Sequence, residues 1–245
     1  MESTTIEKMK KMYLKGMATA YQEDTRTGSI RNYTTGEYLS VLIDAEWEHR
    51  QNRKIAGLKR TAKFRAPGAL PTLIDYSAAR GLDKDLINRL LELKFLKNKE
   101  NVIITGSTGT GKSFLAQAIG NKACEMINRV YYYPMTKFVE DIQTMRLQGT
   151  YHKWMHKLKK SELMILDDFG ITGLDDQTRK VLMDIIDYKY EKSSIIISSQ
   201  LPVSSWHELI GEQTIADAIM DRIVYSSHRV ELQGESMRRK KKILA

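Results

Sequence analysis

The stretch Asn101–Gly120, NVIITGSTGTGKSFLAQAIG, decides the fold of this 245-residue chain. It holds the pattern G-x-x-x-x-G-K-S from Gly106 to Ser113, between a short apolar run and an amphipathic segment. A strand, a glycine-rich loop and a helix in this order are typical of a P-loop, where glycines let backbone N–H groups converge on phosphate oxygens. The pattern therefore predicts a nucleotide-phosphate site in a parallel α/β fold.

The residues of this loop have separate expected roles in binding a nucleotide. We expect Lys112 to reach the β- and γ-phosphates and the Ser113 hydroxyl to ligate Mg²⁺. The helix that follows adds the positive end of its dipole. The residues predicted to surround the phosphates are Gly106, Ser107, Thr108, Gly109, Thr110, Gly111, Lys112, Ser113 and Phe114.

A second motif, ELMILDDFG at 162–170, ends an apolar run with two carboxylates. We expect Asp167 to hold Mg²⁺, through water or directly, and Asp168 to orient or deprotonate the attacking water. Two acids after a strand can also form a turn or a helix cap. Downstream of a P-loop, with room between for a helix, a strand and a further helix, the pattern favours a metal site.

Further apolar runs alternate with longer amphipathic segments. They are RVYYYP, LMILDD, SIIISSQ and, as a last candidate strand, HRVEL. Alternation of strands and helices predicts a parallel sheet covered by helices.

The segment APGALPT at 66–72 combines two prolines with a glycine. It predicts a linker over 67–76, between a small all-α domain at 1–66 and a P-loop domain at 77–245. Thr4 with Glu7 and Thr34 with Glu37 have capping-box spacing, and apolar residues follow each pair at helical intervals. The second helix is predicted to continue into the basic stretch at 50–65.

The bulk composition limits the class of protein. The formal net charge is +9, which favours a polyanionic partner. The single cysteine, Cys124, excludes an intrachain disulfide and fits a reducing compartment. No apolar run approaches the ~18 residues of a membrane span, and the first residues lack the apolar core of a signal peptide.

Taken together, the motifs resemble the AAA+ ATPases and, within them, the IstB/DnaC-like group. The match to IstB-type transposition helpers is closer and covers nearly the whole chain. It rests on MYLKGMATAYQ, YLSVLIDAEWEHRQNRK and KRTAKF near the N-terminus, followed by the P-loop, LMILDDFG, IIISSQLPVSSWHELIG, ADAIMDRI and HRVELQGESMR. SSQLP and GESMR discriminate best, because many families share the P-loop.

The resemblance implies roles for further residues. Either Ser199 or Gln200 occupies the position of the residue that senses the γ-phosphate, and both remain open. Arg222 occupies the position of an arginine finger, which completes a neighbouring subunit's ATP site; the alternative is an ordinary surface arginine. Arg238 is a candidate second phosphate sensor.

Two departures from the AAA+ pattern affect the expected activity. Many AAA+ proteins carry glutamate where this chain has Asp168, and the shorter side chain lies farther from the water, so we expect slow hydrolysis. Too few residues follow Leu232 for the usual helical C-terminal lid. ATP is then expected to act mainly as an assembly signal.

The stretch RQNRKIAGLKRTAKFR, 50–65, has no acidic residue. In a group that works on DNA, it predicts contact with backbone phosphates, although a solvated helix face is the alternative. A second cluster, TYHKWMHKLKK at 150–160, is either a nucleic-acid contact or a helix with an apolar Trp154 face. The candidate DNA contacts are Arg50, Arg53, Lys54, Lys59, Arg60, Lys63, Lys153 and Lys157.

The resemblance thus implies an ATPase, dependent on ATP and Mg²⁺, that helps an insertion-sequence transposase of the IstA type. It would form an oligomer on duplex target DNA in the ATP state, bend that DNA and deliver it to the transposase. Its expected place is the bacterial cytoplasm, associated with the nucleoid, with no membrane partner. The alternatives are a DnaC-type helicase loader, which favours single strands, and a nucleotide-gated DNA scaffold with negligible catalysis.

Overall fold

The computed structural model describes residues 2–77 and 81–237 of the chain. Its contacts divide between Gly57 and Leu58 into two compact units. This division comes earlier than the expected end of the helical domain at residue 66. The reason is that Leu58, Ala62 and Phe64 pack into the hydrophobic core of the second unit.

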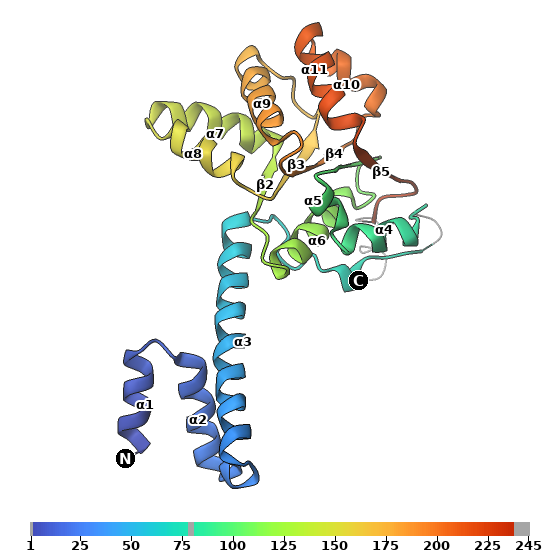
Figure 1. Ribbon diagram of the computed structural model, residues 1–245. Coiled ribbons are helices and arrows are strands. Elements are labelled where there is room, and N and C mark those ends of the chain that lie inside the picture. Colours follow the sequence, from blue (N-terminus) through green and yellow to red (C-terminus); the bar gives the residue numbers. More distant parts are fainter. Residues whose placement is uncertain (1, 78–80, 238–245) are drawn as a thin grey trace. The chain divides into compact units, whose positions relative to one another are not determined.

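The first unit is helical, as predicted, and is shown in blue in Figure 1. Its helices are α1 (Glu2–Lys11), α2 (Lys15–Thr27) and α3 (Thr35–Ala62), of which α3 continues into the second unit. The capping box before α3 is confirmed: Thr34 N–H donates to Glu37 Oε2 (2.8 Å), and Glu37 N–H donates to Thr34 Oγ1 (3.4 Å). The cap at Thr4 is wrong, because α1 already begins at Glu2.

A buried carboxylate joins α2 to α3 within the first unit. Glu46 Oε2 accepts hydrogen bonds from Gly16 N–H (2.7 Å) and Met17 N–H (3.2 Å). Its other oxygen accepts from Arg50 Nε at 2.7 Å. A Cβ on Gly16 would come within 2.4 Å of the Ala45 carbonyl oxygen, so glycine permits this close approach of the two backbones.

The second unit contains a five-stranded sheet in the order β2-β3-β4-β1-β5, in which each pair of neighbours is parallel. This confirms the predicted parallel α/β fold and all of the apolar runs predicted as strands. The strands are β1 (Asn101–Gly106), β2 (Val130–Pro134), β3 (Leu163–Phe169), β4 (Ser194–Ser199) and β5 (Ser227–Leu232).

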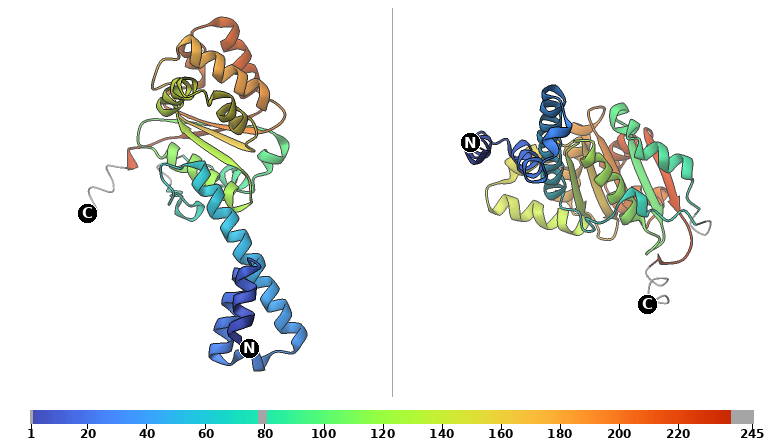
Figure 2. Two further views of the ribbon diagram at one scale, coloured as in Figure 1. Left: turned by 90° about the vertical axis from the view of Figure 1, so that its left-hand side faces the viewer. Right: turned by 90° about the horizontal axis from the view of Figure 1, so that it is seen from below.

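Helices cover both faces of this sheet (Figure 2). The helices on one face are α7 (Met135–Leu147), α8 (Tyr151–Lys159), α9 (Asp176–Lys189), α10 (Trp206–Ile210) and α11 (Gln213–Val224). Those on the other are α4 (Lys84–Leu91), α5 (Lys94–Asn98), α6 (Lys112–Glu125) and the end of α3. In the described residues, no helix is both long and apolar enough to cross a membrane.

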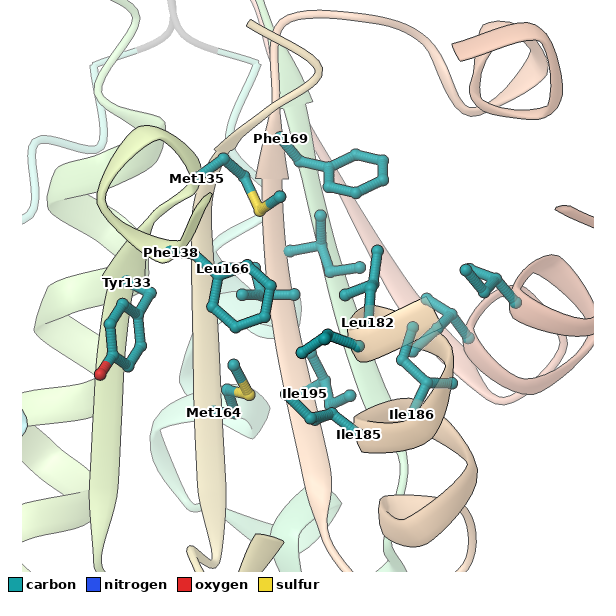
Figure 3. Packing of buried hydrophobic residues seen from close by; sticks show 14 of the residues in the cluster. Tyr133, Met135, Phe138, Met164, Leu166, Phe169, Leu182, Ile185, Ile186 and Ile195 are labelled. Atoms are coloured by element: carbon teal, nitrogen blue, oxygen red, sulfur yellow. The ribbon is translucent and has the colours of Figure 1, made fainter. Parts of the chain in front are cut away.

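Strand alternation supplies the two hydrophobic cores. In β1, Ile103 belongs to one core, whereas Val102 and Ile104 belong to the other. Figure 3 shows the first core, where Leu166 of β3 lies in the same cluster as Phe138 of α7. Near-continuous apolar strands are typical of a parallel sheet buried on both faces.

The segment predicted as a linker, 67–76, is packed onto α6. Ala69 and Ile74 are buried, and Asn121 Nδ2 of α6 donates to the Ala69 carbonyl oxygen at 2.9 Å. The segment is therefore packed against the second unit, whereas the prolines and the glycine predict a linker.

A buried lysine gives the second unit a specific pH dependence. Lys189 is 1% exposed, and its Nζ donates to the Ser161 carbonyl oxygen (2.8 Å), Ser161 Oγ (2.8 Å) and Ser193 Oγ (3.1 Å). Burial lowers the pKa of Lys189 from 10.5 to about 7. Between these values the unfolded chain binds more protons than the folded chain, so this group makes stability rise with pH.

We expect the free energy of unfolding, measured by urea denaturation, to rise more steeply from pH 7 to pH 9 in the wild type than in Lys189→Met. The slopes should differ by up to roughly 1 kcal/mol per pH unit. The methionine fills much of the same space and has no proton to lose. Equal pH slopes in the two proteins would show that the Lys189 ammonium is not lost in the folded state.

Candidate nucleotide site at the P-loop

The loop between β1 and α6 has the backbone of a phosphate cradle. Gly106, Gly109 and Gly111 have φ values of +144°, +84° and +96°, a region that favours glycine. A Cβ on Gly106 would lie 2.3 Å from the Leu232 carbonyl oxygen, and one on Gly109 would lie 2.1 Å from Ser236 Oγ. The three glycines are thus required by conformation, and two of them also by space.

Lys112 begins α6 and is folded back over the loop. Its side chain is buried, and its Nζ donates to the Ser107 carbonyl oxygen at 2.8 Å. The Lys112 ammonium thus lies among the backbone groups that would surround a bound phosphate chain.

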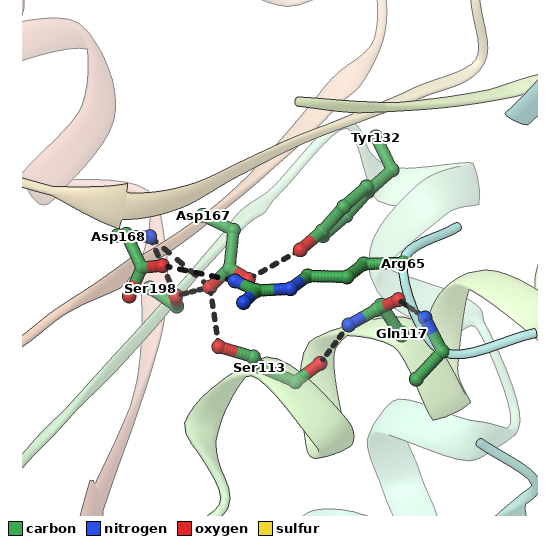
Figure 4. A network of polar contacts seen from close by, with 8 residues as sticks. Arg65, Ser113, Gln117, Tyr132, Asp167, Asp168 and Ser198 are labelled. Carbon is green, nitrogen blue, oxygen red and sulfur yellow. Dashed lines mark hydrogen bonds and ion pairs between the residues drawn. The ribbon is translucent and has the colours of Figure 1, made fainter. Parts of the chain in front are cut away.

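Asp167 is the centre of a polar network shown in Figure 4. Its carboxylate is fully buried, and Oδ1 accepts a hydrogen bond from Ser113 Oγ at 2.9 Å. The Ser198 hydroxyl also contacts Oδ1, and Tyr132 Oη donates to Oδ2 at 2.6 Å. Burial, together with Asp167, raises the pKa of the Tyr132 phenol, so the phenol stays protonated as a donor.

A hydroxyl and a carboxylate oxygen in contact are the donor set that Mg²⁺ prefers. The Ser113–Asp167 pair therefore fits the ion predicted for this position, and Tyr132 and Ser198 hold the Asp167 carboxylate toward it.

Asp168 projects into the groove beside the loop because the β3 backbone is irregular there. The register between β3 and β4 shifts between Leu166 and Phe169, and Asp168 has a φ of +59°. Its N–H donates to Asp167 Oδ1 (3.1 Å) and Ser198 Oγ (3.3 Å). Positive φ in a residue other than glycine is a strained conformation that concentrates at functional sites.

The groove in front of the P-loop has a volume of about 450 Å³, and Lys112, Ser113, Phe114 and Asp168 line it. Gln200 also lines it, and Thr108 Oγ1 donates to Gln200 Oε1 at 2.5 Å. Ser199 is buried instead: its hydroxyl donates to the Phe169 carbonyl oxygen (2.7 Å) and accepts from Leu201 N–H (3.0 Å). Of the two predicted sensors, only Gln200 faces the groove.

Arg222 lies at the opposite end of the sheet from the P-loop. Asn101 Nδ2, at the start of β1, donates to the Arg222 carbonyl oxygen at 3.1 Å, whereas the P-loop follows the end of β1. Its guanidinium pairs with Asp187 at 3.0 Å and lies over the Tyr190 ring. The structure therefore does not bring Arg222 to the P-loop of its own chain.

The GESM segment that follows β5 lies on the P-loop, where Met237 N–H donates to the Gly109 carbonyl oxygen at 2.9 Å. Arg238, the predicted second phosphate sensor, lies outside the described residues.

Comparison with known proteins agrees with this geometry. Residues 7–245 match the family model described as IstB-like ATP binding protein. The chain belongs to this family. It is 40% identical to the putative insertion sequence ATP-binding protein y4pL of Sinorhizobium fredii, over 96% of each chain. It is 29% identical to the insertion sequence IS5376 putative ATP-binding protein of Geobacillus stearothermophilus, over 96% of this chain and 93% of that one.

Among solved structures, the fold of this IstB-like chain is similar to that of the DnaC helicase loader, with a TM-score of 0.55 at 20% identity, over 68% of this chain and 97% of that one. DnaI gives a TM-score of 0.57 at 19% identity, over 73% of this chain and 94% of that one. At such identities the likeness concerns the fold alone.

The predicted DNA contacts divide into side chains with an ion pair and side chains without one. Arg50 pairs with Glu46 (2.7 Å) and Lys59 with Glu125 of α6 (3.0 Å). The acidic partners of these two side chains lie outside the basic stretch 50–65. The exposed candidates, for which no ion pair occurs within residues 2–77 and 81–237, are Arg53, Lys54, Arg60, Lys63, Lys153 and Lys157.

Three of these lysines line one groove of the second unit. Lys63 after α3 and Lys153 and Lys157 of α8 surround about 480 Å³ beside β2, together with Tyr131. Two clusters that are far apart in the sequence thus meet at one place. Trp154 between the lysines is buried, and its Nε1 donates to Tyr133 Oη at 2.8 Å, so the apolar side of α8 predicted in the alternative is also present.

Sequence reasoning missed three residues of the nucleotide site: Arg65, Tyr132 and Ser198. Arg65 Nη1 lies 4.0 Å from Asp168 Oδ2. Ser198 had a usable signal, because it ends the apolar run of a strand whose neighbour carries Asp167. Tyr132 had none, since only the packing of β2 beside β3 brings its hydroxyl to Asp167.

Proposed function

We propose that this chain is an ATP-dependent DNA-binding helper of an insertion-sequence transposase. In the ATP state it assembles as an oligomer on duplex target DNA, bends that DNA and delivers it to an IstA-like transposase. The observation that carries this proposal is the match over nearly the whole chain to insertion-sequence ATP-binding proteins, including the 40% identity to the Sinorhizobium protein.

The nucleotide part of the proposal assigns each group at the P-loop. Backbone N–H groups of the loop and Lys112 bind the phosphates, and Ser113 and Asp167 hold Mg²⁺, which neutralises charge on the phosphate oxygens. Asp168 orients the water that attacks the γ-phosphate, and Gln200 contacts that phosphate. Since Asp168 carries one methylene fewer than glutamate, turnover is slow and is stimulated by DNA or by the transposase.

The DNA part of the proposal rests on the lysine groove. Lys63, Lys153 and Lys157 are exposed cations from two segments, the turn after α3 and α8, which suits a phosphodiester backbone and gives little sequence preference. Bending a short duplex costs several kcal/mol, which phosphate contacts repeated around an oligomer offset.

To test the DNA part, we would replace Lys63, Lys153 and Lys157 together with glutamine and measure duplex affinity by fluorescence anisotropy over a range of salt concentrations. Each lost phosphate contact lowers the slope of log affinity against log salt by about 1, so a decrease of about 3 is expected. The matched control replaces Lys97, Lys180 and Lys192, which removes the same charge elsewhere on the second unit.

Equal slopes in the two triple variants would contradict the lysine groove as a DNA site. The same assay with a single strand of equal length separates a transposition helper from a DnaC-type helicase loader. A transposition helper prefers the duplex, and a clear preference for the single strand would favour the helicase loader.

A further inference from the structure

Arg65 is the one residue of the basic stretch 50–65 that lines the P-loop groove. It follows the end of α3 at Ala62, and its Nη1 lies 4.0 Å from Asp168 Oδ2. Figure 4 shows the Arg65 side chain extending toward Asp168, near Asp167 and Ser113. A candidate DNA-binding element and a candidate catalytic carboxylate are thereby joined by one side chain.

The segment that carries Arg65 is fastened to the residues of the nucleotide site. Ala66 N–H donates to Gln117 Oε1 (2.7 Å), and Gln117 Nε2 donates to the Ser113 carbonyl oxygen (2.9 Å). Gln117 and Ser113 both lie on α6, the helix that starts at the P-loop. A shift of the backbone at Ala66 therefore acts on the first turn of that helix.

Phe64 supplies a second connection, to the proposed Mg²⁺ ligand. Its ring contacts the Tyr132 ring (centroids 6.2 Å apart), and Tyr132 Oη donates to Asp167 Oδ2. The ring also occupies the space beside Gly120, where a Cβ would lie 2.8 Å from Phe64 Cε1. Phe64 and Ala66, the residues on either side of Arg65, thus each contact a side chain that hydrogen-bonds to a proposed Mg²⁺ ligand, Tyr132 to Asp167 and Gln117 to Ser113.

The charges around Arg65 suit two kinds of partner. Asp167 and Asp168 are adjacent carboxylates, and the guanidinium is a cation beside them. With magnesium triphosphate bound, Ser113 and Asp167 would hold the ion, and Arg65 would face the negatively charged phosphates in the groove that it lines. A phosphate oxygen would then replace Asp168 as the partner of Arg65.

We propose that Arg65 is a positioning residue that couples nucleotide occupancy of the P-loop to DNA binding at the end of α3. This inference rests on the proposed function, because it assumes that the exposed Arg60 and Lys63 bind duplex phosphates. When Arg65 exchanges Asp168 for the triphosphate, the segment after α3 moves and Arg60 and Lys63 move with it. By linkage, duplex bound at Arg60 and Lys63 strengthens magnesium-triphosphate binding by the same factor.

The test is the ratio of duplex dissociation constants without and with magnesium and a non-hydrolysable ATP analogue, measured by anisotropy. We expect a ratio of about 5 to 150 in the wild type, the usual range of coupling, and of about 1 in Arg65→Gln. In Arg65→Gln, the affinity for the ATP analogue without duplex should fall by a smaller factor than the ratio of duplex dissociation constants does. Arg65→Lys, which keeps the charge, should recover part of the ratio. Arg129→Gln, which removes an exposed ion pair with Glu162, is the matched control and should keep the wild-type ratio.

An Arg65→Gln chain that keeps the wild-type ratio would overturn the coupling role while leaving the proposed function intact. A wild-type chain that does not bind duplex in either nucleotide state would overturn both. Loss of both individual affinities in Arg65→Gln, with an altered thermal unfolding midpoint, would make Arg65 a structural residue and also overturn the coupling role.

Discussion

Replacing Lys112 with alanine is expected to lower ATP turnover by about 10²–10³-fold, the loss typical of removing one group that stabilises charge in a transition state. The Lys112 ammonium is buried among the backbone groups of the P-loop, so no other side chain of the loop can replace it. Phosphate release measured with saturating ATP and duplex gives the result.

Lys122→Ala is the matched control, because Lys122 is in the last turn of the same helix, α6. It should keep wild-type turnover. Wild-type turnover in Lys112→Ala, with an unchanged unfolding midpoint, would show that the P-loop is not the hydrolytic site of this chain.

Replacing Arg222 with alanine is expected to lower turnover by about 10³-fold or more while leaving ATP affinity unchanged. The reason is that Arg222 lies at the end of the sheet away from its own P-loop, and the resemblance to AAA+ ATPases implies that it serves the site of a neighbouring subunit. Arg229→Ala, which removes an exposed arginine from β5, is the control.

Mixing Arg222→Ala with Lys112→Ala tests this role directly. The first protein contributes intact P-loops and the second contributes intact arginines, so assemblies of both should recover part of the lost turnover. Mixed assemblies that form on duplex yet remain inactive, or an Arg222→Ala protein with full activity by itself, would return Arg222 to the role of a surface arginine paired with Asp187.

The sequence predicted the parts of this structure that depend on local pattern. The apolar runs became the five parallel strands, and the glycine spacing became the loop between β1 and α6. The position of Asp167 beside the P-loop serine could be predicted, because it ends a buried strand downstream of the P-loop; its role as a Mg²⁺ ligand stays a prediction. Each of these inferences uses neighbours within a short stretch of chain.

Most of the omissions concern contacts between distant residues. Arg50 and Lys59 were candidate DNA contacts, and both have ion-pair partners outside the basic stretch: Glu46, one turn before Arg50 in the same helix, and Glu125 in α6. The prolines at 67 and 71 signalled a linker, but Asn121 fastens that segment to α6. Only the fold shows that Arg65 reaches Asp168, and only the irregular register of β3 against β4 explains how one of two adjacent aspartates is buried while the other lines the groove.

Under the proposed function, ATP gates assembly on duplex DNA, and sedimentation velocity measures that assembly. The protein would be sedimented with and without a mixed-sequence duplex, in ATP, in ADP and in a non-hydrolysable analogue with Mg²⁺, at low and at raised salt. We expect a large complex only where duplex and a triphosphate are both present, and we expect that complex to dissociate at raised salt. A chain that sediments as a monomer in every nucleotide state, with or without duplex, would contradict it.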